Sequence, residues 1–298
     1  MVSVIIATHN HAHFLSECLN SVKQQTYPDY EVILVDNGST DDTKEVVKKL
    51  SWDKLKYHYQ ENTGSVAGPR NTGLKLAKGQ YVAFLDSDDF WYKNKLSTVI
   101  AKLVEDPAID ILTHDLFAKD ENGSDHVMRV GPPAKDMFRH LLLSNRLLGS
   151  ATVAKKSVMN EIGGFDGRPE FVHAEDYETW LRLAYRGKKF NFLNETLGVY
   201  RIHGGNLSRD FERASFDEIN VLRRHLSDYR SKYPFDKFIL SRRVMGRTYY
   251  WLGTKHLQNH RWLKGAFYIM RSVLLSPEYI LKLFSSMKKY LKQRTEHK

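Results

Sequence analysis

Residues 2–36, VSVIIATHNHAHFLSECLNSVKQQTYPDYEVILVD, decide the fold class of this chain. The runs at 2–7 and 31–36 are short, apolar and rich in β-branched residues, which is typical of buried strands. Between them, apolar side chains recur at helical spacing, at Phe14, Leu15, Cys18, Leu19 and Val22. The stretch therefore predicts a strand, a crossover helix and a second strand, the unit from which parallel sheets are built.

The same alternation continues along the chain, with helices predicted at 43–50 and 69–78 and strands at 55–59 and 81–86. It predicts an α/β fold with a mostly parallel central sheet and helices on both faces. Ligands of such sheets bind beyond the carboxyl ends of the strands. Functional residues are therefore expected just after Ala7, Asp36, Tyr59 and Leu85.

Charge divides the chain into two parts. Residues 1–208 carry 25 Lys and Arg against 27 Asp and Glu, a balance of −2, whereas residues 209–298 carry 20 against 8, a balance of +12; together they give the net +10. The second part shows no strand pattern. We therefore predict an α/β domain at 1–208 and an all-α basic domain at 209–298.

The remaining elements are predicted with a looser pattern. A hairpin is expected from 109–117 and 126–130, around the turn-forming DENGSD, followed by a helix at 175–186 and a strand at 197–202. The basic part is expected to form helices at 211–229, 235–258, 261–275 and 278–293.

Composition excludes several classes of protein. With 298 residues, 42% of them hydrophobic, the chain can bury a core, and its single cysteine cannot form an intramolecular disulfide. No apolar run approaches the roughly 18 to 20 residues of a membrane span, and no signal peptide is evident. Dinucleotide and P-loop motifs are absent after the first strand, where a Gly-rich loop would be required. We expect a cytoplasmic protein.

Four consecutive polar residues, Asp86, Ser87, Asp88 and Asp89, follow the strand at 81–86. Neighbouring carboxylates repel one another unless a cation or hydrogen-bond donors compensate them. Oxygen ligands of this kind suit Mg²⁺ or Mn²⁺, which in turn bind diphosphate oxygens. The alternative is that Asp88 or Asp89 caps a helix at 92–105.

Seven segments of residues 1–208 together resemble family 2 glycosyltransferases, which have the GT-A fold. In order, they are VSVIIATHN, SVKQQTY, EVILVDNGSTDDT, ENTGSVAGPRNTGLKLAKGQYVAFLDSDD, GGFD, HAEDYETWLRLAYRG and YRIHGGNLS. Each segment alone is a weak signal, whereas seven in this order are a strong one. The resemblance implies a nucleotide-activated sugar donor, a divalent cation and inversion of the anomeric centre.

The resemblance also implies the residues that bind the nucleotide sugar. They are Ala7, Thr8, Asn10, Asp36, Arg70, Asp86, Ser87 and Asp88. Three of them also have structural alternatives: Asn10 as a helix cap, Asp36 as a turn former and Arg70 as a partner in a surface salt bridge. A cation at a helix start opposes the helix dipole, so the place of Arg70 favours a functional role.

A Mn²⁺ or Mg²⁺ site is implied at Asp86 and Asp88, with Asp88 as the direct ligand and Asp86 nearer the ribose. His203 resembles a position that supplies a further metal ligand or contacts the diphosphate, and a structural role is the alternative. His9, His11 and His13 alternate along the chain. They lie in a loop and a helix start, where alternation does not place side chains on one face, so no zinc site is predicted there.

Asp176 is the predicted general base. An inverting displacement needs a carboxylate that takes the proton of the acceptor hydroxyl, and the family places it in an acidic pair at the head of a helix, here Glu175 and Asp176. Glu175 is expected to support the acceptor or the fold, and Asp166 in GGFD to line the acceptor side. Without the resemblance, both members of the pair would be read as acids that favour a first helical turn.

The basic part offers a further pattern at 278–293. Ile280, Phe284, Met287 and Leu291 form a stripe beside Lys282, Lys288, Lys289 and Lys292, which is typical of a basic amphipathic helix. Three roles remain open for this helix: binding to an anionic membrane, assembly into a homo-oligomer, and packing in the core of the domain.

We therefore predict a glycosyltransferase that moves a sugar, expected to come from a UDP-sugar, to a hydroxyl of a glycan or glycoconjugate. It is expected in the cytoplasm, peripheral on the inner face of the membrane. A polyprenyl-phosphate sugar transferase is less favoured, because membrane-spanning helices often accompany that role. A nucleic-acid-binding protein would leave DSDD unexplained and lacks a recognition motif, so no nucleic-acid partner is expected.

Overall fold

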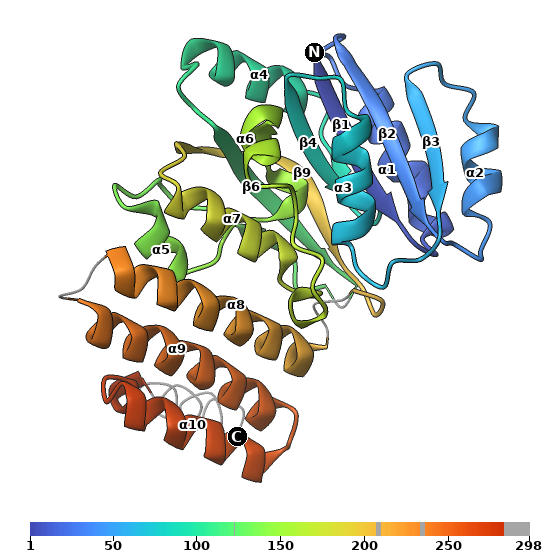
Figure 1. The fold of residues 1–298 in the computed structure, drawn as a ribbon. Helices are drawn as coiled ribbons and strands as arrows, with labels where there is room; N and C mark the ends of the chain where they lie inside the picture. The colour runs from blue at the N-terminus through green and yellow to red at the C-terminus, as the bar shows by residue number, and fades with distance from the viewer. Residues whose placement is uncertain (122, 207–209, 233–235, 283–298) are drawn as a thin grey trace. The chain divides into compact units, whose positions relative to one another are not determined.

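The chain forms two compact units in a computed structural model, Met1–Asn206 and Leu207–Lys298. The structure describes residues 1–121, 123–206, 210–232 and 236–282 (Figure 1). Among these residues, no helix is both long and apolar enough to cross a membrane. The roles predicted for the two parts, catalytic for 1–208 and basic helical for 209–298, remain predictions.

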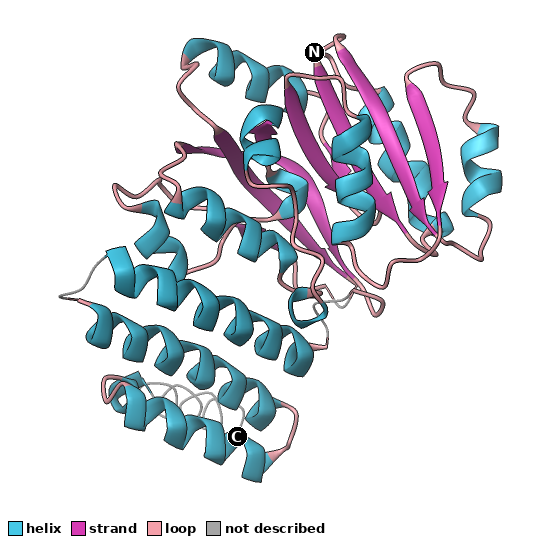
Figure 2. Ribbon diagram, viewed as in Figure 1, coloured by secondary structure: helices cyan, strands magenta, loops and turns pink. Residues whose placement is uncertain are grey.

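The first unit is built on one sheet, shown in magenta in Figure 2. Its strands are β1 (Val2–Thr8), β2 (Tyr30–Asn37), β3 (Leu55–Gln60), β4 (Tyr81–Asp86), β5 (Phe90–Trp91), β6 (Ile111–Asp120), β7 (His126–Met128), β8 (Val153–Lys155) and β9 (Phe190–Ile202). Its helices are α1 (Ala12–Lys23), α2 (Thr43–Lys49), α3 (Ala67–Leu76), α4 (Lys95–Glu105), α5 (Met137–Leu143), α6 (Lys156–Glu161) and α7 (Glu175–Tyr185).

The described strands pair in the order β3-β2-β1-β4-β8-β6-β9-β5, with β7 beside β6. The pairings among β3, β2, β1 and β4 are parallel, as is β6 with β9, and the other four are antiparallel. The α/β class and the β6–β7 hairpin are thus confirmed. The strand β9 is longer than expected, and β8 was missed because a three-residue strand carries no measurable periodicity.

Helices cover both faces of the parallel strands. On one face, Val4 and Ile6 of β1 share a buried core with α1 and α4. On the other, α3 lies so close that a Cβ added at Gly73 would be 2.4 Å from Cγ2 of Ile5. Strands buried on both faces read as continuous apolar runs, which is why 2–7 was recognisable in the sequence.

Parallel register places the predicted donor-binding residues along one edge. Thr8 is the partner of Asp36, Ala7 is the partner of Asp86, and Asp36 is also the partner of Tyr59. The carboxyl ends of β1, β2, β3 and β4 therefore lie together, as the alternation of strands and helices led us to expect.

The second unit contains α8 (Phe211–Lys232), α9 (Lys237–Gln258) and α10 (Trp262–Leu275), which lie side by side (Figure 1). Glycines bring α9 and α10 close together, since a Cβ at Gly253 would be 2.9 Å from the backbone nitrogen of Ile269. Of the helix expected at 278–293, residues 283–293 lie outside the described residues.

Candidate active site

The ends of β1 and β2 supply the first part of the site. Thr8 is buried, and its Oγ1 has no hydrogen-bond partner in the described part of the chain. Asn10 follows with a positive φ of 56°, and its Oδ1 accepts a hydrogen bond from the backbone nitrogen of Thr40 at 2.8 Å. Asn10 thus joins the loop after β1 to the turn after β2 rather than capping α1, whose N-cap is His11.

Asp36 ends β2 with both carboxylate oxygens engaged. Oδ1 accepts from the backbone nitrogen of Ser39 at 2.8 Å, and Oδ2 accepts from the Tyr57 hydroxyl at 2.7 Å. Burial, together with this carboxylate, raises the pKa of Tyr57 and keeps its hydroxyl a donor. Asp36 therefore stabilises the turn after β2, as its structural alternative predicted. Each carboxylate oxygen retains a lone pair with which it could also accept a hydrogen bond from a nucleobase.

Arg70 connects the strand-four edge with the acidic pair. Its guanidinium, almost fully buried, lies with Nη2 2.5 Å from Oδ1 of Asp86 and with Nη1 2.5 Å from Oε1 of Glu175. The ring of Phe165, in the GGFD segment, lies 5.4 Å from the guanidinium carbon. Arg70 therefore makes buried contacts with two acidic side chains, and the surface salt bridge considered from the sequence is wrong.

Asp88 faces the C-terminal end of β9. Its Oδ2 lies 3.1 Å from Nε2 of His203 and accepts from Nδ2 of Asn206 at 3.2 Å. Next to it, Oγ of Ser87 lies 2.9 Å from Nδ1 of His11. The rings of His11 and His203 are edge to face, 6.1 Å apart. Two residues of DSDD are thus each paired with an imidazole.

Asp89 has a structural role in the protein interior. It is fully buried, and its carboxylate accepts from Oγ of Ser150 at 2.5 Å and from the backbone nitrogen of Arg201 at 2.9 Å. Burial, reinforced by Asp88, raises the pKa of Asp89 well above its usual range. The helix-cap alternative for Asp88 and Asp89 is wrong, because α4 begins after Asn94.

The acidic pair opens α7, as expected for the predicted general base. Glu175 is buried and Asp176 is half-buried, with Oδ1 of Asp176 2.6 Å from the backbone nitrogen of Tyr177. Burial raises the pKa of Glu175 to about 8, against the opposing effect of Arg70, and burial also raises the pKa of Asp176. For Asp176, the predicted base, a raised pKa makes the ionised carboxylate a stronger proton acceptor, whereas Glu175 holds its proton near neutral pH.

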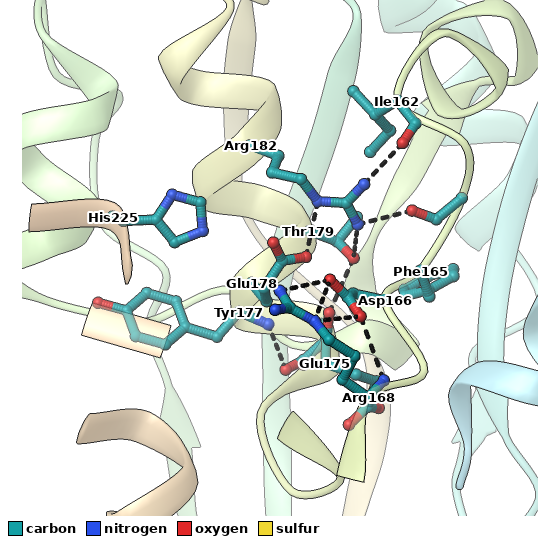
Figure 3. A network of polar contacts seen from close by, with 12 residues as sticks. Ile162, Phe165, Asp166, Arg168, Glu175, Tyr177, Glu178, Thr179, Arg182 and His225 are labelled. Atoms are coloured by element: carbon teal, nitrogen blue, oxygen red, sulfur yellow. Dashed lines mark hydrogen bonds and ion pairs between the residues drawn. The ribbon is translucent and has the colours of Figure 1, made fainter. Parts of the chain in front are cut away.

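A second arginine fixes α7 against the GGFD loop, as Figure 3 shows. Arg182 forms an ion pair with Glu178 at 2.7 Å and donates to the carbonyl oxygens of Ile162 and Gly164, each at 2.7 Å. Four residues before it, Glu178 is fully buried. These contacts hold α7, the helix that carries Asp176, against the loop that contains Ile162 and Gly164.

Asp166 pairs with a close neighbour in the sequence. Its carboxylate accepts from Nε of Arg168 at 3.1 Å and from Nη2 at 2.9 Å, and the two side chains face each other in Figure 3. Such a local pair is what a turn residue makes. The predicted role of Asp166 on the acceptor side remains a prediction.

The residues present fit a divalent cation only in part. Among the described residues, no group of three His, Cys, Asp or Glu side chains is arranged as a metal centre. Asp88 and His203 nevertheless bring a carboxylate oxygen and an imidazole nitrogen to 3.1 Å, whereas Asp86 is held by Arg70. Mg²⁺ is commonly held by one or two carboxylates and completed by substrate phosphates, so Asp88 fits such an ion, whereas an imidazole such as that of His203 suits Mg²⁺ less well.

Three contacts of the site were missed from the sequence: His11 with Ser87, Asn206 with Asp88 and Asn71 with Phe165. Asn71 donates to the carbonyl oxygen of Phe165 and accepts from its backbone nitrogen, both at 2.8 Å. Asn206 stands three residues after His203 in YRIHGGNLS, and this spacing was the one available signal.

Comparison with known proteins gives the family match. The model described as Glycosyl transferase family 2 matches residues 3–161. A relative from Escherichia coli, UDP-Glc:alpha-D-GlcNAc-diphosphoundecaprenol beta-1,3-glucosyltransferase WfaP, is 29% identical over 223 residues, which cover 75% of this chain and 86% of that enzyme.

Two solved structures have a similar fold. One is TarS 1-349 of S. aureus in complex with UDP-GlcNAc, with a TM-score of 0.59, 21% identity, and coverage of 94% of this chain and 92% of that one. The other is mannosyltransferase PcManGT from Pyrobaculum calidifontis in complex with GDP-Man and Mn2+, with a TM-score of 0.63, 20% identity, and coverage of 99% and 82%. At these identities the likeness concerns the fold, which is of the GT-A type.

Proposed function

This chain belongs to glycosyl transferase family 2 and is a glycosyltransferase, and from that premise we propose that it transfers a sugar from a UDP-sugar to a hydroxyl of a lipid-linked glycan, with inversion. The observation that carries the proposal is the continuous contact from Asp86 through Arg70 to Glu175. It joins the edge where the donor would bind to the helix that bears the proposed base.

The donor would lie along the edge formed by Thr8, Asp36 and Asp86. Among the described residues, the buried Oγ1 of Thr8 has no hydrogen-bond partner, so a ligand could satisfy it, since such atoms are rarely left unpaired. Uridine is supported by the UDP-GlcNAc complex of TarS and by the UDP-Glc donor in the name of WfaP.

Asp88 and His203 would hold the divalent cation, together with oxygens of the donor's diphosphate. When bound, such an ion neutralises negative charge on the departing diphosphate. The Mn2+ complex of PcManGT supports this assignment. Asn206 would orient the Asp88 carboxylate, because it donates to the same oxygen that faces His203.

Asp176 would act as the general base in a single displacement. Its carboxylate takes the proton of the acceptor hydroxyl while that oxygen forms a bond to the anomeric carbon. The bond from the anomeric carbon to the diphosphate oxygen breaks, and its electron pair leaves with UDP. Attack from the face opposite the leaving group inverts the anomeric centre.

A lipid-linked acceptor is supported by the name of WfaP, which acts on a diphosphoundecaprenol-linked GlcNAc. It belongs to the glycoconjugate class predicted from the sequence, and it differs from a bare polyprenyl phosphate. The predicted peripheral location on a membrane would fit such an acceptor.

A donor screen tests the proposal. Release of the nucleoside diphosphate would be measured with UDP-Glc, UDP-GlcNAc, UDP-Gal and GDP-Man, each with Mn²⁺ and with EDTA. The expected result is turnover of a UDP-sugar that EDTA abolishes. Turnover of GDP-Man alone would contradict the uridine assignment, and full turnover in EDTA would contradict the cation.

A further inference from the structure

Helix α10 is apolar on two opposite faces. Gly265, Ile269 and Ser272 form its buried face. Leu263, Phe267, Met270 and Leu274 recur at intervals of four, three and four residues, and we call them the outer stripe. The outer stripe is offset from the buried residues by two positions, which in an α-helix places it on the opposite side.

The outer stripe is exposed. Leu263 is 91% exposed, Leu274 66%, Met270 56% and Phe267 49%. A helix that is apolar all round is normally buried, and a contiguous exposed apolar patch marks an interaction site. Trp262, at the start of the same helix, is 63% exposed and adds an aromatic group of the kind found where apolar and aqueous phases meet.

Positive charge borders the outer stripe. Helix α10 has no Asp or Glu, and Lys264 and Arg271 lie one heptad apart along it. Lys264 and Arg261 each lie 2.7 Å from a carboxylate oxygen of Glu212, so these three side chains keep one net positive charge. The guanidinium carbon of Arg271 lies 4.4 Å from the ring of Tyr249. Residues 209–298 as a whole carry a balance of +12.

We propose that the outer stripe docks on an anionic lipid surface. Apolar side chains bordered by Lys and Arg are what allows a helix to lie in a lipid interface, with the apolar face inserted and the cations at the headgroups. A second copy of this chain is the less suitable occupant, because pairing of two outer stripes would bring the same positive borders together.

The proposal is independent of the donor and base assignments. It concerns α10, whereas the amphipathic pattern recognised in the sequence was that of 278–293. If it holds, the enzyme would be held at the surface where a lipid-linked acceptor is found.

Vesicle sedimentation of the full chain tests it. Vesicles of phosphatidylcholine alone would be compared with vesicles that also contain phosphatidylglycerol. The test variant is Leu263→Gln with Leu274→Gln, which keeps the charge. The matched control is Phe238→Gln with Ile239→Gln on α9, where the two side chains are 67% and 58% exposed. Circular dichroism and thermal unfolding would establish that each variant is folded.

The expected result is binding to the phosphatidylglycerol vesicles that salt weakens. The outer-stripe variant should bind at least about tenfold more weakly, because two large apolar side chains no longer leave water, whereas the control should stay within about twofold. Absence of binding by the unmodified chain, or equal binding by the outer-stripe variant, would overturn the proposal.

Three other outcomes would also overturn it. Equal binding to vesicles of phosphatidylcholine alone would show that the outer stripe does not require an anionic lipid. A dimer in light scattering that the outer-stripe variant converts to a monomer, with vesicle binding unchanged, would assign the face to a second copy. Binding that occurs only after removal of residues 283–298 would assign the face to that segment of the chain.

Discussion

Arg70 donates a buried hydrogen bond to Glu175, with Nη1 2.5 Å from Oε1, although 105 positions separate the two residues in the sequence. The same guanidinium holds Asp86 through its other terminal nitrogen. Helix α3 is therefore joined both to the end of β4 and to the first turn of α7. The proposed donor edge and the proposed base are thus parts of one electrostatic network.

Replacing Arg70 should destabilise the fold strongly. Arg70→Gln leaves the Asp86 carboxylate without its cation and Glu175 without its hydrogen-bond donor, and removal of one partner of a buried ion pair typically costs about 3 to 5 kcal/mol. Urea unfolding would measure it. Arg186→Gln is the matched control, since Arg186 pairs with Glu161 at the surface, and its effect should be within about 0.5 kcal/mol. Equal small losses for both variants would contradict a role for the Arg70 network in stability.

Replacing Asp176 should abolish most of the turnover but spare donor binding. Asp176→Asn is nearly isosteric and cannot take a proton near neutral pH, so turnover should fall by about 10² to 10⁴. Steady-state kinetics and calorimetry of UDP binding would measure the two effects. Asp106→Asn, at an exposed pair with Lys189, should retain normal turnover. If Asp176→Asn stayed active, Glu175 would be the next candidate for the base.

Replacing Asp88 should largely eliminate the binding of nucleotide that depends on a divalent ion. Calorimetry of UDP with Mn²⁺ should show binding that EDTA or Asp88→Ala largely eliminates, because the carboxylate paired with His203 would hold the ion. The matched control is Asp106→Asn with Mn²⁺, which should bind as the unmodified chain does. Undiminished binding by Asp88→Ala would show that the ion is held elsewhere.

Glu175 should make stability fall as the pH rises. Burial raises its pKa from an ordinary 4.5 to about 8, so between these values the folded chain keeps a proton that the unfolded chain has released. The folded state then loses stability as the pH rises, by up to about 1.4 kcal/mol per pH unit for one proton.

Urea unfolding across this pH range would measure the decline. Glu175→Gln should reduce it, because the amide does not titrate, whereas Glu161→Gln, at a surface pair with Lys188, should retain it. A decline of the same size in Glu175→Gln would show that other groups, such as Asp89, are responsible for it.

The sequence by itself determined the fold class and the sheet edge at which we propose that the donor binds. Buried parallel strands appear in a sequence as continuous apolar runs, so β1, β2 and β4 were recognisable from residues 2–7, 31–36 and 81–86. Once these strands are parallel, register alone brings Thr8, Asp36 and Asp86 to one edge. Local sequence was less informative between β6 and α7, where β8 and α6 are too short to show a period.

Tertiary structure alone decided which side chains meet across that edge. Nothing in the sequence around Arg70 indicates that it contacts both Asp86 and Glu175. The spacing of His203 and Asn206 does not by itself show that both meet the carboxylate of Asp88. Contacts between residues far apart in the chain depend on how helices pack on a sheet, and no local periodicity encodes them. The exposure of Leu263 and Leu274 was also decided by tertiary structure. The sequence pattern of an apolar helix position is the same whether that face of the helix is covered or exposed to solvent.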